Sequence, residues 1–431
     1  MKIAQVAPLI ESVPPRLYGG TERIVSYLTD ELVRLGHDVT LFASGDSISS
    51  AVLAPCCTRA LRLDPAMPDA IPHSMLMIDK VRQRAEEFDV LHFHIDLFHF
   101  PLFRSLASRT LTTLHGRQDL GDLGTFYSRF REMPLVSISD DQRKPLPHAK
   151  FMTTIHHGIP ADLHRPSFEK GKYLAFLGRI SPDKRPDRAI RIARAAGMPL
   201  KIAAKIDKVD EDYFRSEILP LIDGPGVEFV GEINEREKTK FLGEAAALLF
   251  PVDWPEPFGL VMIEAMACGT PVLAFRCGSI PEVIEDGITG KVVDSEQEAV
   301  AALPALLSYD RRALRQRFDE RFTAARMAKD YVSTYRQLLR MRTSNGQKRS
   351  PWLRRGGLNG GNGSTPMSVE RPLPALAQAG ANSEIDPIRM RVVDLSAMLP
   401  SRDPEAMRAD ENVIRVSAVG REYPILSEAA I

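Results

Sequence analysis

Short apolar runs alternate with stretches of helical spacing from the start of the chain to residue 341. The first such stretch places apolar side chains on one helical face, at Ile24, Leu28, Leu32 and Leu35. A loop ending in Gly19-Gly20 precedes this helix, and Gly36 follows it as a C-terminal stop. The apolar runs predict strands at residues 3–7, 38–42, 90–93, 110–114 and 135–138. Strand, glycine loop, helix and strand in this order open a doubly wound α/β domain.

A second series of the same kind begins at residues 173–178. Its helical patterns cover residues 186–196, 210–222 and 235–245. Its strand patterns cover residues 200–206, 227–230, 247–250, 271–275 and 291–293. This alternation predicts a second parallel sheet that helices cover on both faces. Ligands of such sheets bind beyond the carboxyl ends of the strands, so a site between two such domains is expected.

The pattern changes towards the C-terminus, where a long helical stretch over residues 322–341 is followed by a linker composition rich in Gly, Asn and Ser. We therefore divide the chain into four parts. They are a Rossmann-like domain at 1–160, a second one at 161–325, a helix at 326–343 that packs back toward the first domain, and a linker and tail at 344–431. The tail is expected to be disordered or a small appended element. Residues 51–72 have weak periodicity and leave their structure open.

Composition narrows the classes of function. The 431 residues carry 56 basic and 56 acidic side chains, so the chain has no net charge. This balance argues against a nucleic acid as the partner. The four cysteines form no Cys-x-x-Cys pair, which fits a reducing compartment. The first residues predict a strand rather than a signal peptide, and no apolar run reaches the ~20 residues that cross a bilayer. A cytoplasmic location is expected.

The densest candidate chemistry lies in the two-glutamate stretch, residues 251–272. Glu256 stands in a Pro-rich loop, whereas Glu264 lies within a short apolar helix that Gly259 opens. A helix start offers unpaired N–H groups and the positive end of a dipole, which suit a phosphate. Earlier in the same domain, Arg179 and Lys184 follow a strand and suit a diphosphate.

Other polar clusters have simpler interpretations. His92, His94 and His99 are of a metal-ligating type, but no cysteine or Glu-x-x-His motif accompanies them, so core or cleft histidines are favoured. The acidic residues at 210–212 open a helix, where carboxylates are stabilised by the dipole. The apolar residues 97–106 are favoured as a core helix, and a peripheral membrane contact there stays open.

Taken in order, these motifs resemble the retaining glycosyltransferases of family 4, the bacterial group 1 type. The resemblance rests on Gly19-Gly20 with Glu22, Gly36–Val39, Thr113–Gly116, Ser137–Ser139, Gly178-Arg179 with Lys184, the two-glutamate stretch, Gly278–Glu282 and Gly287–Gly290. It covers residues 1 to about 341. It implies the GT-B form of the α/β class, with two facing Rossmann-like domains with parallel sheets, plus a C-terminal crossover helix and a flexible tail.

The resemblance also implies roles for individual side chains. Arg179 and Lys184 match the cations that hold the donor diphosphate. Glu264 matches the carboxylate that binds the ribose hydroxyls, and Glu256 matches the one that faces the donor sugar. His115 resembles the histidine that contacts this sugar from the first domain.

Backbone groups complete the implied donor site. The amides of Phe258, Gly259 and Leu260 are expected at the distal phosphate and the sugar. Gly19 and Gly20 form the first-domain loop that approaches the donor closely. Glu282 matches an acidic position of the family whose role here stays open.

The implied reaction is the transfer of a sugar, with retention, from a UDP- or GDP-type nucleotide sugar to an unidentified acceptor, without metal or cofactor. The first domain is expected to bind the acceptor. Two alternatives stay open on the same fold, a nucleotide-sugar epimerase or phosphorylase and a non-catalytic nucleotide-sugar-binding protein. A nicotinamide oxidoreductase is disfavoured because the first loop has no Gly-x-Gly-x-x-Gly.

Overall fold

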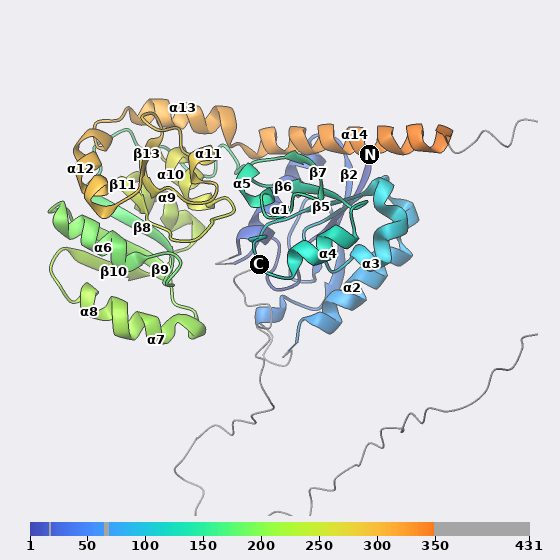
Figure 1. Cartoon of the computed structure of the whole chain (residues 1–431), viewed down its shortest axis with the longest axis horizontal. Helices are drawn as coiled ribbons and strands as arrows, with labels where there is room; N and C mark the ends of the chain where they lie inside the picture. The colour runs from blue at the N-terminus through green and yellow to red at the C-terminus, as the bar shows by residue number, and fades with distance from the viewer. Residues whose placement is uncertain (17–18, 64–68, 349–431) are drawn as a thin grey trace, which may run out of the picture. The chain divides into compact units, whose positions relative to one another are not determined.

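The computed structural model describes residues 1–16, 19–63 and 69–348, all within one compact unit. The tail from residue 349 onward and Tyr18 of the first glycine loop lie outside the described residues. Two sheets, each with helices around it, make up this unit (Figure 1). The predicted fold class, two Rossmann-like α/β domains with parallel sheets, is confirmed.

The first sheet is entirely parallel, with strand order β3-β2-β1-β4-β5-β6-β7. Its strands are β1 (Lys2–Val6), β2 (Asp38–Ser44), β3 (Val52–Cys57), β4 (Val90–Phe93), β5 (Thr110–Thr113), β6 (Pro134–Ser137) and β7 (Lys150–Thr154). The main helices around it are α1 (Gly20–Arg34), α2 (Ile71–Gln83), α3 (Phe100–Phe103), α4 (Leu123–Arg129) and α5 (Asp140–Arg143). The strand order reverses between β1 and β4, which creates the switch point where doubly wound sheets bind ligands.

The second sheet is also parallel, with strand order β10-β9-β8-β11-β12-β13. Its strands are β8 (Tyr173–Arg179), β9 (Leu200–Lys205), β10 (Val227–Gly231), β11 (Ala245–Phe250), β12 (Val272–Phe275) and β13 (Gly290–Val293). The helices are α6 (Pro186–Ala195), α7 (Glu211–Tyr213), α8 (Leu219–Ile222), α9 (Glu235–Gly243), α10 (Leu260–Ala267), α11 (Ile280–Val283), α12 (Glu296–Leu306) and α13 (Arg311–Arg321). Its switch point lies between β8 and β11.

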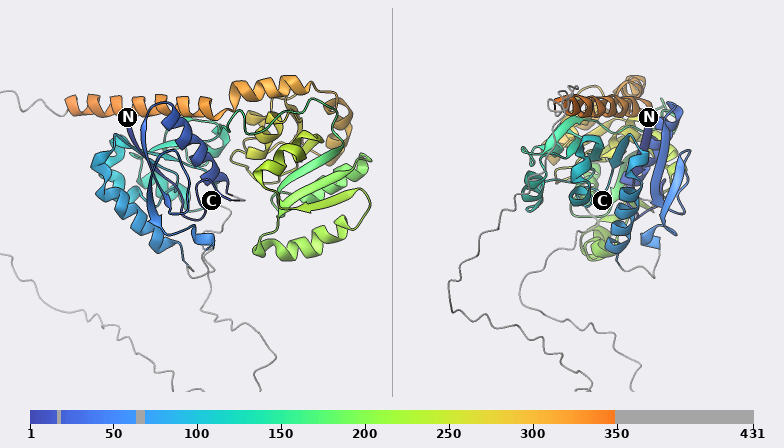
Figure 2. Two further views of the ribbon diagram at one scale, coloured as in Figure 1. Left: turned by 180° about the vertical axis from the view of Figure 1, so that it is seen from behind. Right: turned by 90° about the vertical axis from the view of Figure 1, so that its right-hand side faces the viewer.

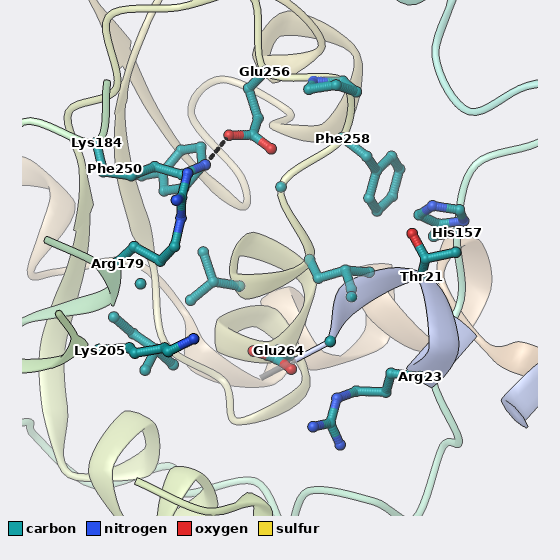
Figure 3. A pocket seen from close by; sticks show the side chains of 18 of the residues that line it. Thr21, Arg23, His157, Arg179, Lys184, Lys205, Phe250, Glu256, Phe258 and Glu264 are labelled. Atoms are coloured by element: carbon teal, nitrogen blue, oxygen red, sulfur yellow. Dashed lines mark hydrogen bonds and ion pairs between the residues drawn. The ribbon is translucent and has the colours of Figure 1, made fainter. Parts of the chain in front are cut away.

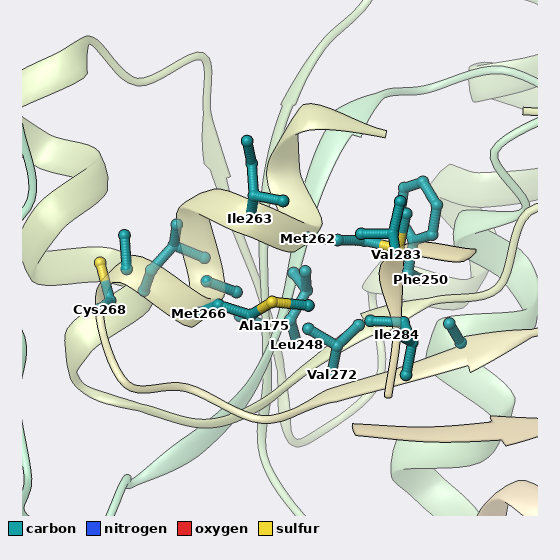
Figure 4. Close-up of a cluster of buried hydrophobic side chains, with 14 of the residues drawn as sticks. Ala175, Leu248, Phe250, Met262, Ile263, Met266, Cys268, Val272, Val283 and Ile284 are labelled. Atoms are coloured by element: carbon teal, nitrogen blue, oxygen red, sulfur yellow. The ribbon is translucent and has the colours of Figure 1, made fainter. Parts of the chain in front are cut away.

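Helix α10 is apolar almost all round and is therefore buried against this sheet. Met262 and Met266 pack with Leu248 of β11 and Val272 of β12 in one core cluster (Figure 4). All four side chains are fully buried, and each stabilises the fold by about 1.5–3 kcal/mol through burial. This packing fixes where the helix begins, and therefore where its free N–H groups lie.

Helix α14 (Ala324–Lys348) runs along the first domain (Figures 1 and 2). Its buried face carries Met327, Tyr331 and Tyr335, which pack with Ile24 and Leu28 of α1. The chain therefore returns to the first domain after completing the second, as the helical pattern predicts. The helix continues to Lys348, so the linker predicted from residue 344 is wrong in its first residues.

Several elements were not predicted, and each lacks a strong periodic signal. β3 and β7 are the two edges of the first sheet. Val52 of β3 is 64% exposed and Pro55 within the strand has no backbone N–H, while every residue of β7 is only partly buried. The helix predicted over residues 210–222 is divided into α7, a π-helical turn and α8, where Pro220 removes a backbone donor.

The apolar segment 97–106 forms α3 and a 3-10 turn. Phe100 and Phe103 are fully buried, which agrees with the core interpretation, whereas Leu102 is exposed. Among the described residues, no helix combines the length and the hydropathy that a membrane span needs.

Glu282 at the start of α11 links the second domain to the first. Its carboxylate accepts hydrogen bonds from the backbone N–H groups of Asp140 (2.7 Å) and Asp141 (2.8 Å), and from His156 (3.3 Å). Asp140 and Asp141 begin α5, so a side chain of one domain caps a helix of the other. Burial alone would raise the pKa of Glu282, but His156 and the two amides outweigh it and lower this pKa below 4.5.

We expect Glu282→Gln to lower the free energy of unfolding at neutral pH by about 1 kcal/mol, because it removes a charged cap. A carboxyl with a lowered pKa contributes stability above its unfolded pKa and loses it as pH falls through the folded pKa. The difference between wild type and variant should therefore shrink as the pH falls below 4.5. Denaturant unfolding across pH measures this. The exposed Glu169→Gln is the control, and an equal effect in both variants would contradict the capping role.

Candidate functional site

A cleft of about 250 Å³ is lined by residues of both domains, at the carboxyl ends of β5, β8 and β11 (Figure 3). The first domain contributes the glycine loop at 19–21 and the residues after β5. The second contributes the ends of β8 and β9 and the two-glutamate stretch. This location is the one that two doubly wound sheets favour for a ligand.

Among the second-domain cations that line the cleft, Arg179, Lys184 and Lys205 lie at or just after the carboxyl ends of the strands β8 and β9. Arg179 ends β8 and Lys205 ends the neighbouring β9, and the register pairs these two residues directly. Asp207 lies between them, 3.4 Å from Arg179 Nη1 and 2.6 Å from Lys205 Nζ. Parallel strands therefore bring together positive charges that suit a multiply charged anion.

Lys184 is held by the loop that carries Glu256. Its ammonium forms an ion pair with the Glu256 carboxylate and lies 4.7 Å from the centroid of the Trp254 ring. Both partners are largely buried, so the pair is shielded from solvent. The pair joins the loop after β8 to the loop after β11.

Gly278 and Ser279 pack against the backbone of the loop that carries Glu256. Gly278 has φ 54°, and a Cβ there would lie 2.5 Å from the backbone N and O of Glu256. The N–H of Ser279 donates to the Glu256 carbonyl at 3.0 Å, and its hydroxyl donates to the Phe258 carbonyl at 3.0 Å. The motif at 278–282 therefore holds the backbone of Glu256 in place through Gly278 and Ser279. The same motif contacts the first domain through Glu282.

Gly259 sets the start of α10 in the cleft wall. Its φ of 79° favours glycine, and a Cβ would meet Met262 Cε at 2.7 Å and Phe250 Cζ at 3.1 Å. The helix begins at Leu260, so its unpaired N–H groups lie in the cleft wall beside the cations. Across the cleft, a Cβ on Gly20 would meet Leu260 at 3.7 Å, an ordinary contact that leaves the loop surface open.

Glu264 is 3% exposed and accepts a hydrogen bond from Lys238 Nζ of α9 at 2.9 Å. Burial would raise its pKa, but Lys238, His164 and Arg23 together outweigh burial and lower it. Glu264 is therefore a charged carboxylate inside an apolar helix, with its own cation. A ligand hydroxyl in the cleft can donate to it.

Arg23 brings the first domain into this charge network. Its guanidinium, one turn into α1, lies 2.5 Å from the Glu235 carboxylate of α9. His164, Glu235 and Glu264 hold potential metal ligands within 4.8 Å of one another. Arg23 pairs with Glu235, and Lys238 lies 3.5 Å from Glu235 and 2.9 Å from Glu264. Protein cations therefore already compensate the charge of both carboxylates, which favours an internal ion-pair network.

His115 lines the cleft from the end of β5. Its Nε2 lies 2.8 Å from His94 Nδ1, and its ring stacks on His157 with centroids 5.3 Å apart. Burial lowers the pKa of His115 to about 3, so the ring is neutral near pH 7. His92 and His99 are buried and bonded to threonine hydroxyls, as core histidines.

All of the predicted site residues line this one cleft. They are Gly19, Gly20, His115, Arg179, Lys184, Glu256, Phe258, Gly259, Leu260 and Glu264. The sequence did not point to Arg23, Lys205, Lys238, Trp254 or His157, which line it too. Lys205 could have been predicted, because it ends the strand β9, which pairs with β8, the strand that ends in Arg179. The roles of these residues stay predictions.

Comparison with known proteins adds an independent finding. The family model described as "Glycosyl transferases group 1" matches residues 163–323, and the one described as "Glycosyltransferase Family 4" matches residues 18–137. A D-inositol 3-phosphate glycosyltransferase of Mycobacterium leprae is 31% identical over 152 residues, 32% of this chain and 36% of that protein. A 41.2 kDa protein of the Klebsiella pneumoniae cps region is 29% identical over 170 residues, 38% and 46% of the two chains. The matches thus span about a third to a half of these relatives.

Solved structures share the fold. AviGT4, a glycosyltransferase of avilamycin A biosynthesis, superposes with a TM-score of 0.59 at 23% identity, over 79% of this chain and 98% of that one. Sucrose-phosphate synthase of Thermosynechococcus elongatus gives a TM-score of 0.64 at 18% identity, over 79% and 100%. HepE of Anabaena, solved with UDP and glucose, gives 0.59 at 18% identity, over 78% and 100%.

We expect Lys238→Ala to destabilise the protein by about 3 kcal/mol at pH 7.5, because it leaves the buried Glu264 charge without its closest cation. Without Lys238, the pKa of Glu264 rises above its unfolded value, so the loss grows as pH rises and is smaller at pH 5. Denaturant unfolding at the two pH values measures it. The exposed Lys240→Ala on the same helix is the control, and an effect of Lys238→Ala that does not change with pH would contradict the pairing.

Proposed function

This chain belongs to the group 1, family 4 glycosyltransferases, and we propose that it transfers a sugar from a nucleoside diphosphate sugar to an acceptor. The observation that carries this proposal is the second-domain wall of the cleft. Arg179 and Lys184 stand beside the start of α10, with Glu256 and Glu264 on either side of that start. Such a wall can bind two phosphates, a ribose and a sugar in sequence.

The donor would lie along this wall. Glu264, charged and buried, would accept hydrogen bonds from the ribose hydroxyls. Arg179, Lys184 and the N–H groups at Gly259 and Leu260 would bind the diphosphate. The complexes of Anabaena HepE with UDP and UDP-glucose support a uridine nucleotide as the first donor to test, with a GDP sugar as the alternative.

We propose that the reaction proceeds with retention, by attack on the same face from which the diphosphate leaves. The acceptor proton passes to the departing phosphate oxygen. Charge that develops on this oxygen is stabilised by Arg179, Lys184 and the helix start. A double displacement would need a free carboxylate nucleophile roughly 5 Å from an acid. Glu256 is engaged by Lys184 and Glu264 by Lys238, which argues against that route.

We expect Lys184→Ala and Glu256→Gln each to lower kcat by about a hundredfold or more, because each disrupts groups that act on the developing charge. Product formation from a panel of UDP and GDP sugars measures this, with circular dichroism to verify the fold. Lys201→Ala is the matched control, since Lys201 is a cation of the same sheet that does not line the cleft. Full turnover in both site variants would refute the assignment.

We expect transfer to continue in excess EDTA, because the side chains and helix start supply the positive charge that a metal provides in other transferases. Rates with EDTA, Mg²⁺ and Mn²⁺ are compared on protein freed of metal by dialysis. Activity that requires an added divalent ion would show that the carboxylates of the cleft hold a metal, and would refute this part of the proposal.

A further inference from the structure

A chain of buried polar side chains leads from α14 to the cleft histidine. Tyr335 Oη lies 2.8 Å from His92 Nδ1 and accepts from Gln5 Nε2 at 3.1 Å. Gln5 Oε1 lies 2.8 Å from His94 Nε2, and His94 Nδ1 lies 2.8 Å from His115 Nε2. Gln5 and the two inner histidines are at most 2% exposed, so each must satisfy its polar atoms within the protein.

The direction of these hydrogen bonds follows from Gln5. Its Oε1 can only accept, so His94 Nε2 carries the proton of that bond. Burial lowers the pKa of His94 well below 6.5, so the ring is neutral and its Nδ1 has no proton. His94 Nδ1 must then accept from His115 Nε2. Since His115 is neutral too, its own Nδ1 carries a lone pair.

The free nitrogen belongs to a ring that lines the cleft. His115 Nε2 is turned to His94, and within the described part of the chain no protein group hydrogen-bonds Nδ1. The ring face is covered by His157, which limits rotation. A ligand in the cleft can therefore reach His115 Nδ1, and the hydrogen bonds of His94 and Gln5 set whether this nitrogen carries a proton.

We propose that Gln5 and His94 are positioning residues that hold His115 in the tautomer protonated at Nε2, so that Nδ1 accepts a hydrogen bond from a hydroxyl of the transferred sugar. The identity of the ligand rests on the proposed function, whereas the tautomer does not. The reverse orientation of the Gln5 amide would reverse each bond in turn and leave His115 with an N–H donor at Nδ1. The two arrangements predict opposite results.

The tautomer is measured directly by long-range ¹H–¹⁵N correlation on the full chain labelled in histidine. His115→Gln identifies the signals of His115. We expect the wild-type proton on Nε2, and a mixture of both tautomers in His94→Phe. His99→Phe is the matched control, because His99 is equally buried and bonds Thr112 outside this chain of contacts. A wild-type proton on Nδ1 of His115 would overturn the proposal.

Transfer kinetics test whether Nδ1 of His115 accepts a hydrogen bond from a hydroxyl of the transferred sugar. We expect His94→Phe to lower kcat/KM about tenfold, the worth of one hydrogen bond, with partial rescue in His94→Asn, whose amide oxygen can accept from His115. His99→Phe should retain wild-type kcat/KM. A series of monodeoxy donors identifies the hydroxyl. With one donor of this series, the losses of kcat/KM in His115→Ala and in His94→Phe relative to wild type should both vanish. Equal losses with every deoxy donor would overturn the acceptor role of Nδ1. Absence of transfer in wild type would refute the proposed function and leave the tautomer measurement decisive for the positioning.

Discussion

A carboxylate inside an apolar helix requires a partner, and much of the cleft is arranged around this requirement at Glu264. Helix α10 packs its methionines on the second sheet, and Glu264 on the same helix is only 3% exposed. Lys238 of α9 supplies the nearest cation at 2.9 Å, and Glu235 of the same helix binds Arg23 from the first domain. One buried charge thus ties α10 to α9 and α9 to α1. The same constraint keeps the start of α10 in the cleft wall, where its N–H groups stay available.

Two of the contacts between the domains lie at the cleft and at α5. Arg23 and Glu235 form the first, and Glu282 with the first amides of α5 forms the second. The second contact belongs to the motif at 278–282, whose Gly278 and Ser279 also hold the Glu256 loop. A displacement of α5 would therefore shift Glu282. Because Gly278 and Ser279 precede Glu282 in the same motif, it would also shift the loop that carries Glu256. The position of the sugar-facing carboxylate depends in this way on the packing between domains.

Most of the fold could be predicted because central parallel strands are buried on both faces and read as apolar runs, as in residues 245–250. The edge strands β3 and β7 have no such pattern, since one side of each meets solvent. The site was predicted where its residues follow one another in the chain, in the two-glutamate stretch. Arg23 and Lys238 could not be found that way, because their partners Glu235 and Glu264 are defined only when separate helices pack. An arginine on an amphipathic helix is, in sequence, an ordinary surface charge.

The histidines make the same point about chemistry. In sequence, His92 and His94 are of a metal-ligating type, and only the absence of an accompanying cysteine or Glu-x-x-His motif favours core or cleft histidines. Their burial and their bonds to Gln5, Thr113 and Tyr335 exclude water and keep both rings neutral. Of the first-domain residues that line the cleft, His115 is neutral and Arg23 is paired with Glu235, whereas the second domain contributes Arg179, Lys184 and Lys205. A ligand with an uncharged polyol at one end and a diphosphate at the other matches this division, because hydroxyls need acceptors and donors while phosphates need fixed positive charge.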